Sequence, residues 1–123
     1  MKLSPEYIAG LFDGEGTVGL YRDARVYETY KPSVAIELRD EVHTSSVLRT
    51  LCEMYGVKLA KKNRGTCAFR LSGTAAIQRF IDDILPYSRL KTTQLVLLQA
   101  WLENKSYSYR FAQSLKHHKQ RRV

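Results

Sequence analysis

The sequence predicts one α+β domain in which helices cover one face of a four-stranded antiparallel sheet. Two pairs of segments alternate apolar and polar residues, and each pair is followed by a segment with helical spacing. No low-complexity linker divides the 123 residues, and 44% of them are hydrophobic, which is enough to bury a core. We therefore treat 1–123 as a single domain with a basic, frayed tail over 116–123.

The first element is a helix from about residue 5 to residue 14. Ser4 can cap this helix, Pro5 suits its first position, and Gly16 provides a stop. The remaining expected elements follow the alternation and the turn residues. They are strands 17–22 and 31–40, a helix 44–55, strands 57–62 and 66–73, a helix 75–85 and an extra C-terminal helix 92–103.

The charge of the chain favours a polyanionic partner. The formal net charge is +8, from 20 Lys and Arg against 12 Asp and Glu. A surplus of this size on a small domain points to nucleic acid, although a merely soluble basic protein is the alternative. We expect no membrane span, because no run of about 18 apolar residues occurs. Cys52 and Cys67 match no zinc pattern and fit an intracellular, reducing compartment.

Residues 8–16 read IAGLFDGEG and place two glycines inside the first helix. Each interior glycine costs about 1 kcal/mol relative to alanine. At roughly 100° per residue, Gly10 and Gly14 share one sector of the helix, and the apolar residues share another. A stripe of small residues lets a second backbone approach, and a two-fold partner would present the same stripe. The alternative is tight packing of the glycines within one chain.

Glu15 ends this segment, and a symmetric pair of such helices would bring two Glu15 carboxylates together. A divalent cation relieves the repulsion between them, and hard oxygen ligands suit Mg²⁺. The alternative for Glu15 is a solvated acid at a helix end. Lys91, before the last expected helix, could stabilise a phosphate, whereas in isolation it would be a surface lysine.

The sheet face that the helices leave uncovered is expected to bind DNA. A two-stranded ribbon can enter the major groove, and Lys and Arg neutralise phosphates. A plain solvated sheet face is the alternative. Glu37 puts an acid on this face, where it could accept from cytosine or weaken binding. The candidate DNA-binding residues are Tyr21, Lys31, Glu37, Arg39, Lys61, Lys62, Arg64 and Arg70.

IAGLFDGEG resembles the LAGLIDADG motif of the homing endonucleases, without a gap. Ile, Phe, Gly and Glu stand where that motif has Leu, Ile, Ala and Asp. The expected element order matches the αββαββα core of the family. The stretch LPYSRLKTTQ (85–94) is similar to the later family segment that carries a basic catalytic residue. The resemblance spans roughly residues 4–103.

The resemblance implies a homodimeric enzyme that cuts double-stranded DNA at long, palindromic or nearly palindromic sites and leaves 3′ overhangs. It implies Mg²⁺, or another divalent cation such as Mn²⁺, and neither a membrane partner nor a small-molecule substrate. The alternatives are a non-cleaving nucleic-acid-binding protein of the same fold, such as an intron maturase or DNA-binding regulator, and a basic interaction domain with no nucleic-acid role. Organelle, cytoplasm and phage-infected host are not distinguished.

The resemblance also implies residue roles. Glu15 binds the metal, and the carbonyl of Gly14 is a second ligand. Lys91 acts on the water network or a phosphate, Asp40 at the end of the second strand positions water, and Gln94 matches a polar position after the lysine. The candidate catalytic residues are thus Glu15, Lys91, Asp40 and Gln94. The candidate dimer interface comprises Tyr7, Gly10, Asp13 and Gly14, with Asp13, the first acid of the motif, in a structural role.

Overall fold

The helices and strands follow the expected order, with one addition at the end of the chain. The computed structural model describes residues 2–22, 29–62, 64–105 and 108–120. The elements are α1 (Pro5–Glu15), β1 (Gly16–Arg22), β2 (Tyr30–Arg39), α2 (Val42–Tyr55), β3 (Ala60–Lys61), β4 (Thr66–Leu71), α3 (Thr74–Ile84), the 3₁₀ turn η1 (Leu85–Tyr87), α4 (Thr92–Glu103) and α5 (Ser108–Gln120).

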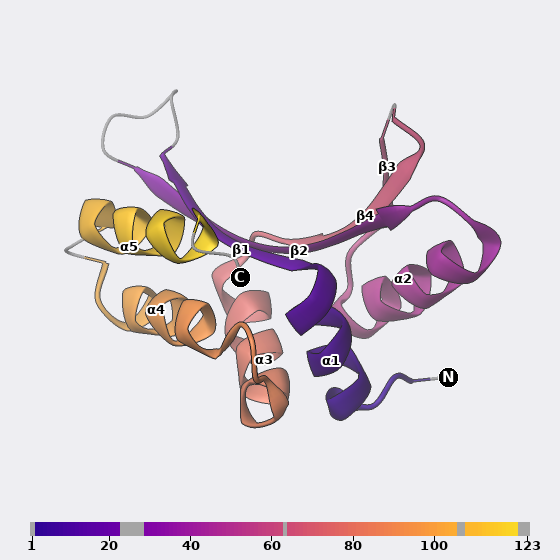
Figure 1. Cartoon of the computed structure of the whole chain (residues 1–123), viewed down its shortest axis with the longest axis horizontal. Helices are drawn as coiled ribbons and strands as arrows, with labels where there is room; N and C mark the ends of the chain where they lie inside the picture. Colours follow the sequence, from indigo (N-terminus) through magenta and orange to yellow (C-terminus); the bar gives the residue numbers. More distant parts are fainter. Residues whose placement is uncertain (1, 23–28, 63, 106–107, 121–123) are drawn as a thin grey trace.

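The strands form one antiparallel sheet in the order β1-β2-β4-β3. The sheet is curved, and the described helices lie on its convex side, so its concave side is uncovered (Figure 1). Val18 pairs with Val34, and Val34 pairs with Leu71, so these three side chains share the covered face. The expected α+β architecture with one covered face is confirmed.

Local chemistry sets the ends of the helices that flank the sheet. The Ser4 hydroxyl accepts a hydrogen bond from the Tyr7 backbone N–H at 3.1 Å, which satisfies one of the free donors at the start of α1. At the start of α2, Glu41 and Thr44 form a reciprocal capping box. Gly56 ends α2 in the left-handed conformation with φ of +70°, which glycine adopts without strain.

Aromatic side chains fill the centre of the core between the sheet and the helices. Phe12 of α1 meets Phe80 of α3 edge to face, with 5.3 Å between the ring centroids. Phe80 also contacts Tyr55 of α2 and Phe69 of β4, at 5.4 Å and 5.7 Å. Ile8, Ala9 and Phe12 are the buried residues of α1, so this helix is anchored along one side only.

Two expectations about the elements were wrong. The third strand was expected over 57–62, but the β3 ladder comprises only Ala60 and Lys61. Residues 57–59 instead connect the end of α2 at Gly56 to the sheet and pair with no strand. The tail was expected to fray from residue 116, but residues 108–120 form α5, which packs on β1 and α4. Leu115 of α5 is buried, and Phe111 and Ala112 pack against the core. Residues 121–123, and most of the expected loop 23–29, lie outside the described residues.

The structure bears on two expectations drawn from the composition, the absence of a membrane span and the state of the two cysteines. None of the described helices is long and apolar enough to cross a bilayer. Cys52 and Cys67 are both buried free thiols, and burial raises the pKa of each thiol.

Phe80→Ala is expected to lower the free energy of unfolding by about 3–5 kcal/mol, because it removes the ring at which α1, α2, α3 and β4 meet. Denaturant titrations at one protein concentration measure this difference. The control is Val42→Ala at a side chain that is 80% exposed, with an expected change within about 0.5 kcal/mol. Equal effects of the two substitutions would contradict this account of the core.

Candidate functional site

Asp13 joins the end of α1 to the segment that leads into α4. Its carboxylate accepts hydrogen bonds from the Ser88 hydroxyl at 2.7 Å, the Arg89 N–H at 2.8 Å and the Lys91 N–H at 3.1 Å. Partial burial opposes the charge of this carboxylate, but the hydrogen bonds from Ser88, Arg89 and Lys91 outweigh it and lower the pKa of Asp13. Asp13, a candidate interface residue, therefore has a structural partner within its own chain.

Lys91 lies against the same end of α1. Its side chain is buried, with 9% of the residue exposed, and its Nζ donates a hydrogen bond to the Asp13 carbonyl at 3.2 Å. The alternative of a plain surface lysine is therefore wrong. Lys91 is the N-cap residue of α4, and the half-buried Gln94 follows in the first turn. The structure thus brings Lys91 to the helix end that carries Glu15, and Gln94 lies three residues further along the chain in α4.

Glu15 is the last residue of α1, and its side chain is exposed. The Glu15 carboxylate and the Gly14 carbonyl are hard oxygen donors of the kind that Mg²⁺ prefers. Among the described residues, no group of three or more His, Cys, Asp and Glu side chains is placed to hold a metal ion. The donors at this helix end fit a divalent cation in their chemistry, but one chain supplies only part of a coordination shell.

Asp40 lies elsewhere in the chain. It follows directly after β2, and its carboxylate forms an ion pair with the Lys61 Nζ at 3.1 Å. Gly16, next to Glu15, pairs with Ile36, so Asp40 is four residues further along, a rise of roughly 13 Å. Asp40 sits at the end of the second strand as expected, but the ladder does not bring it beside the Glu15 of its own chain.

Gly10 and Gly14 lie on an outer face of α1. A Cβ atom built on either glycine would meet nothing within 4 Å. The alternative that these glycines serve close packing within the chain is therefore wrong. Tyr7, one turn before Gly10, is 50% exposed on the same helix. These three residues define the outer face of α1, which no described part of the chain covers.

Alternation places the candidate DNA-binding residues of β1, β2 and β4 on the concave face of the sheet, and the register agrees. Lys61 is an exception, because it pairs with Cys67 and so points to the covered face. The pairs Tyr21–Lys31, Ala35–Arg70, Glu37–Ala68 and Arg39–Thr66 are all on the concave side. Lys62 reaches the same face, because its Nζ lies 3.0 Å from the Glu37 carboxylate. Arg64 is exposed at the tip of the β3–β4 hairpin. Glu37, the acid on the concave side, is thus paired with Lys62, whereas Asp40 pairs with Lys61 on the covered side of the sheet.

Two serines of the site were not among the sequence candidates. Ser33 is 7% exposed, and its hydroxyl accepts a hydrogen bond from Arg70 Nη1 at 3.0 Å. Alternation alone places Ser33 on the concave face, so the pattern could have identified it. Ser88 holds Asp13 from a position 75 residues away, and no local pattern marks that contact.

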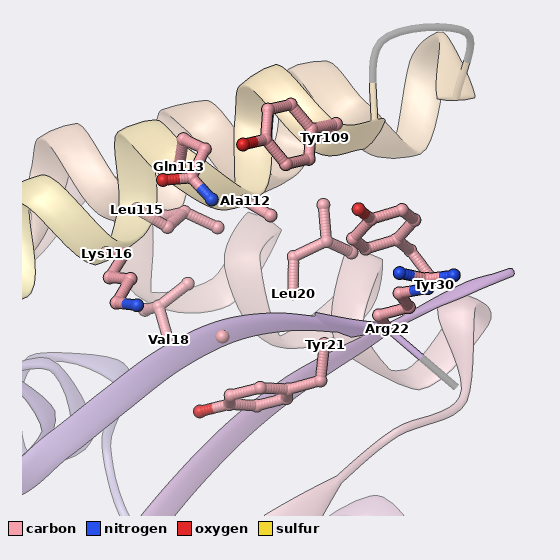
Figure 2. A pocket seen from close by; sticks show the side chains of 11 residues that line it. Val18, Leu20, Tyr21, Arg22, Tyr30, Tyr109, Ala112, Gln113, Leu115 and Lys116 are labelled. Carbon is pink, nitrogen blue, oxygen red and sulfur yellow. The ribbon is translucent and has the colours of Figure 1, made fainter. Parts of the chain in front are cut away.

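The cavity between β1 and α5 lies apart from these groups. It has a volume of about 840 Å³, and Figure 2 shows Val18, Leu20 and Leu115 among its lining side chains. None of the candidate catalytic residues lines it. Tyr21 projects to the other side of the strand from α5 (Figure 2), which agrees with its place on the concave face.

Comparison with known proteins identifies the fold. No family model matches the sequence, and no curated protein matches it. Solved structures do match. The homing endonuclease I-CvuI, in complex with a DNA target, aligns with a TM-score of 0.80 and 19% identity over 93% of this chain and 80% of that chain. The archaeal intron-encoded homing endonuclease I-Vdi141I, complexed with DNA, aligns with a TM-score of 0.75 and 14% identity over 97% of this chain and 86% of that chain.

The LAGLIDADG meganuclease I-CpaMI, bound to uncleaved DNA, aligns with a TM-score of 0.73 and 17% identity over 93% of this chain and 40% of that chain. The chain has the LAGLIDADG homing endonuclease fold. The resemblance drawn from residues 8–16 is thus confirmed for the fold, and identities below 20% extend the likeness no further. In this LAGLIDADG fold the motif forms α1 and its junction with β1, so Glu15 and the outer face of α1 belong to one short segment.

Asp13→Asn is expected to destabilise the chain at neutral pH by about 1.5–3 kcal/mol, since hydrogen bonds to a charged acceptor are lost. The folded-state pKa of Asp13 lies below its ordinary value of 3.8, so its contribution is complete above that pH. The contribution is lost as the pH falls through the lowered pKa. The difference between wild type and variant should therefore shrink in acid.

Urea titrations between pH 7 and about pH 2.5 measure this difference. Ser88→Ala, which removes one donor to Asp13, should reduce stability at neutral pH by a smaller amount. A wild-type-minus-variant difference for Asp13→Asn that stays constant over the whole pH range would contradict this account.

Proposed function

We propose that the protein is a homodimeric, site-specific double-stranded DNA endonuclease that needs a divalent cation. The observation that carries this function is the meeting of Glu15, Lys91 and the outer face of α1 at one helix end. Asp13 fixes this arrangement. The fold supports the proposal, because solved proteins that share it are homing endonucleases, some of them in complex with DNA.

A second copy of the chain accounts for the outer face of α1. Gly10 and Gly14 leave the backbone of α1 open to close approach, and a two-fold axis supplies an identical helix. Because Glu15 lies one residue beyond Gly14, such a pairing places the two Glu15 carboxylates near the axis. A palindromic or nearly palindromic DNA site matches a two-fold protein.

The cofactor of the proposed reaction is Mg²⁺, or another divalent cation such as Mn²⁺. Glu15 and the Gly14 carbonyl of each chain would hold it, with phosphate oxygens completing the shell. When bound, the cation supplies charge neutralisation at the phosphate that is hydrolysed. Structures of I-CvuI in complex with DNA targets were determined in the presence of 2 mM Mg and of 2 mM Ca, which supports this choice.

The remaining chemistry falls to residues around the end of α1. The hydrogen bond to the Asp13 carbonyl keeps the Lys91 ammonium near Glu15, where it can donate to a phosphate oxygen and stabilise developing negative charge. Gln94 lies one turn along α4 and can hold a water molecule by hydrogen bonding. Asp40 orders water from the end of β2, where it pairs with Lys61. Hydrolysis of both strands leaves 3′ overhangs.

The concave face of the sheet would hold the duplex. Lys31, Arg39 and Arg70 on the strands and Lys62 and Arg64 at the β3–β4 tip give this face its positive charge. Arg and Lys side chains that contact phosphates release counterions, so binding should weaken steeply with salt.

The test begins with selection of bound sequences from a pool of randomised duplexes, followed by incubation of the selected duplex with Mg²⁺ or Mn²⁺. We expect salt-dependent binding, and cleavage of both strands that stops when EDTA removes the metal. Binding without cleavage under all metal conditions would overturn the nuclease and favour a maturase or regulator. Binding that does not respond to salt would overturn nucleic-acid recognition itself.

Glu15→Gln is expected to reduce cleavage by more than about 100-fold while the dissociation constant for the selected duplex changes little, because the substitution removes one anionic ligand and little else. Single-turnover cleavage and electrophoretic mobility shifts measure the two effects. Glu6→Gln, an exposed acid at the other end of α1, is the matched control and should cleave as wild type. Wild-type cleavage by Glu15→Gln would disprove the metal assignment.

Gly10→Leu is expected to abolish dimerisation while leaving the monomer folded. The chain has open space at this position, and replacing an interior glycine by leucine favours the helix by roughly 0.8 kcal/mol. Sedimentation equilibrium with circular dichroism separates assembly from folding. Ala75→Leu, at an exposed position of α3, should dimerise as wild type. A stable dimer of Gly10→Leu would show that α1 is not the interface.

A further inference from the structure

The concave face of the sheet has two zones that differ in the size of their side chains. Near the middle, Gly19 pairs with Ser33 on neighbouring strands, and Ala35 pairs with Arg70. A Cβ on Gly19 would overlap the ring of Tyr21, so this ring lies across Gly19. The Tyr21 ring therefore covers Gly19, whereas Arg70 stands beside the small side chains of Ser33 and Ala35.

The cations toward the β3–β4 tip are held by carboxylates. Lys62 lies 3.0 Å from Glu37 on the concave face, and Lys61 lies 3.1 Å from Asp40 on the opposite side of the sheet; both lysines are exposed. Exposed ion pairs contribute little free energy, so a lysine can exchange its carboxylate for a phosphate. Such a contact needs only charge within reach and carries no sequence information.

Arg70 is held differently. Its Nη1 donates to the hydroxyl of Ser33 at 3.0 Å, and Ser33 is 7% exposed on β2, one of the two central strands. The acceptor is neutral and sits in the sheet, so the bond orients the guanidinium without neutralising it. A guanidinium has five N–H donors in a planar fork, and this bond uses one of them. Arg70 itself is exposed, so its remaining donors are open to a ligand above the sheet.

An oriented guanidinium is what recognition of a base edge requires. Guanine presents O6 and N7 side by side in the major groove, and a bidentate arginine discriminates it by about 1–3 kcal/mol. The fixed fork of arginine matches two acceptors, whereas a lysine ammonium acts as a point charge.

We propose that Arg70, positioned by Ser33, reads a guanine in the major groove of each half-site. This inference rests on the proposed function, because it requires a duplex on the concave face. In a two-fold dimer the guanine recurs at the symmetry-related position on the opposite strand. Lys62 and Arg64 are assigned to the phosphate backbone.

Selection from a randomised duplex pool, in Ca²⁺ to permit recovery of intact DNA, tests this division of roles. The wild-type consensus should contain a guanine whose preference falls by about 5- to 150-fold in Arg70→Lys, although the charge is kept. The matched control is Arg64→Lys at the hairpin tip, which should retain the whole consensus. Arg64→Gln should weaken binding to all sequences alike and lower the salt slope by about 1.

Ser33→Ala supplies an independent arm, because it leaves Arg70 in place and removes only the orienting hydroxyl. It should reduce the same guanine preference, by a smaller factor, with a wild-type melting curve. An unchanged consensus in both Arg70→Lys and Ser33→Ala overturns the inference while the proposed function stands. Absence of salt-dependent duplex binding by the wild-type chain overturns the proposed function, and this inference with it.

Discussion

The hydrogen bonds of Asp13 tie the C-terminal end of α1 to the segment before α4. One carboxylate accepts from the Ser88 hydroxyl and from the N–H groups of Arg89 and Lys91, and the Asp13 carbonyl accepts from the Lys91 ammonium. These bonds cross 75 to 78 residues of sequence, so they decide where the last third of the chain meets the motif. These contacts set the position of Lys91 relative to Glu15, because the two residues lie far apart in the sequence.

Because Asp13 fixes the end of α1, the helix keeps one face packed in the core and the other face open. Ile8, Ala9 and Phe12 are buried against the sheet and α3, and the aromatic contact with Phe80 fixes the axis of the helix. With the inner face packed and the end held by Asp13, the helix has little freedom to rotate. Gly10 and Gly14 therefore remain outward and open, which is where a second helix of the same kind can approach without displacing any atom of the chain.

Much of this arrangement follows from local pattern, and the rest follows from contacts that no local pattern carries. Alternation at Val34 and Ile36 sufficed to assign the two faces of β2, because strand geometry sends neighbouring side chains to opposite sides. The IAGLFDGEG motif sufficed for α1 and the fold. The partners of Asp13 lie too far along the chain to be inferred, and α5 was missed because polar residues dominate it and only Phe111, Ala112 and Leu115 mark its inner side. Helix α5 is recognisable as an element only once the covered face of β1 is available as its packing surface.

The two acids near the β3–β4 hairpin, one on each side of the sheet, are each paired with a cation. Glu37 and Asp40 each meet a lysine of the β3–β4 hairpin, so the hairpin is held to β2 by charge as well as by the β4 ladder. If Lys62 turns to a phosphate, Glu37 loses its partner beside a polyanion, which is unfavourable unless a donor such as the cytosine amino group replaces the lysine. In the proposed complex, Glu37 would then penalise duplexes that offer no donor, whereas Arg70 would favour those that offer two acceptors. One oriented arginine and one acid would thereby give a basic face that contacts phosphates a preference between sequences.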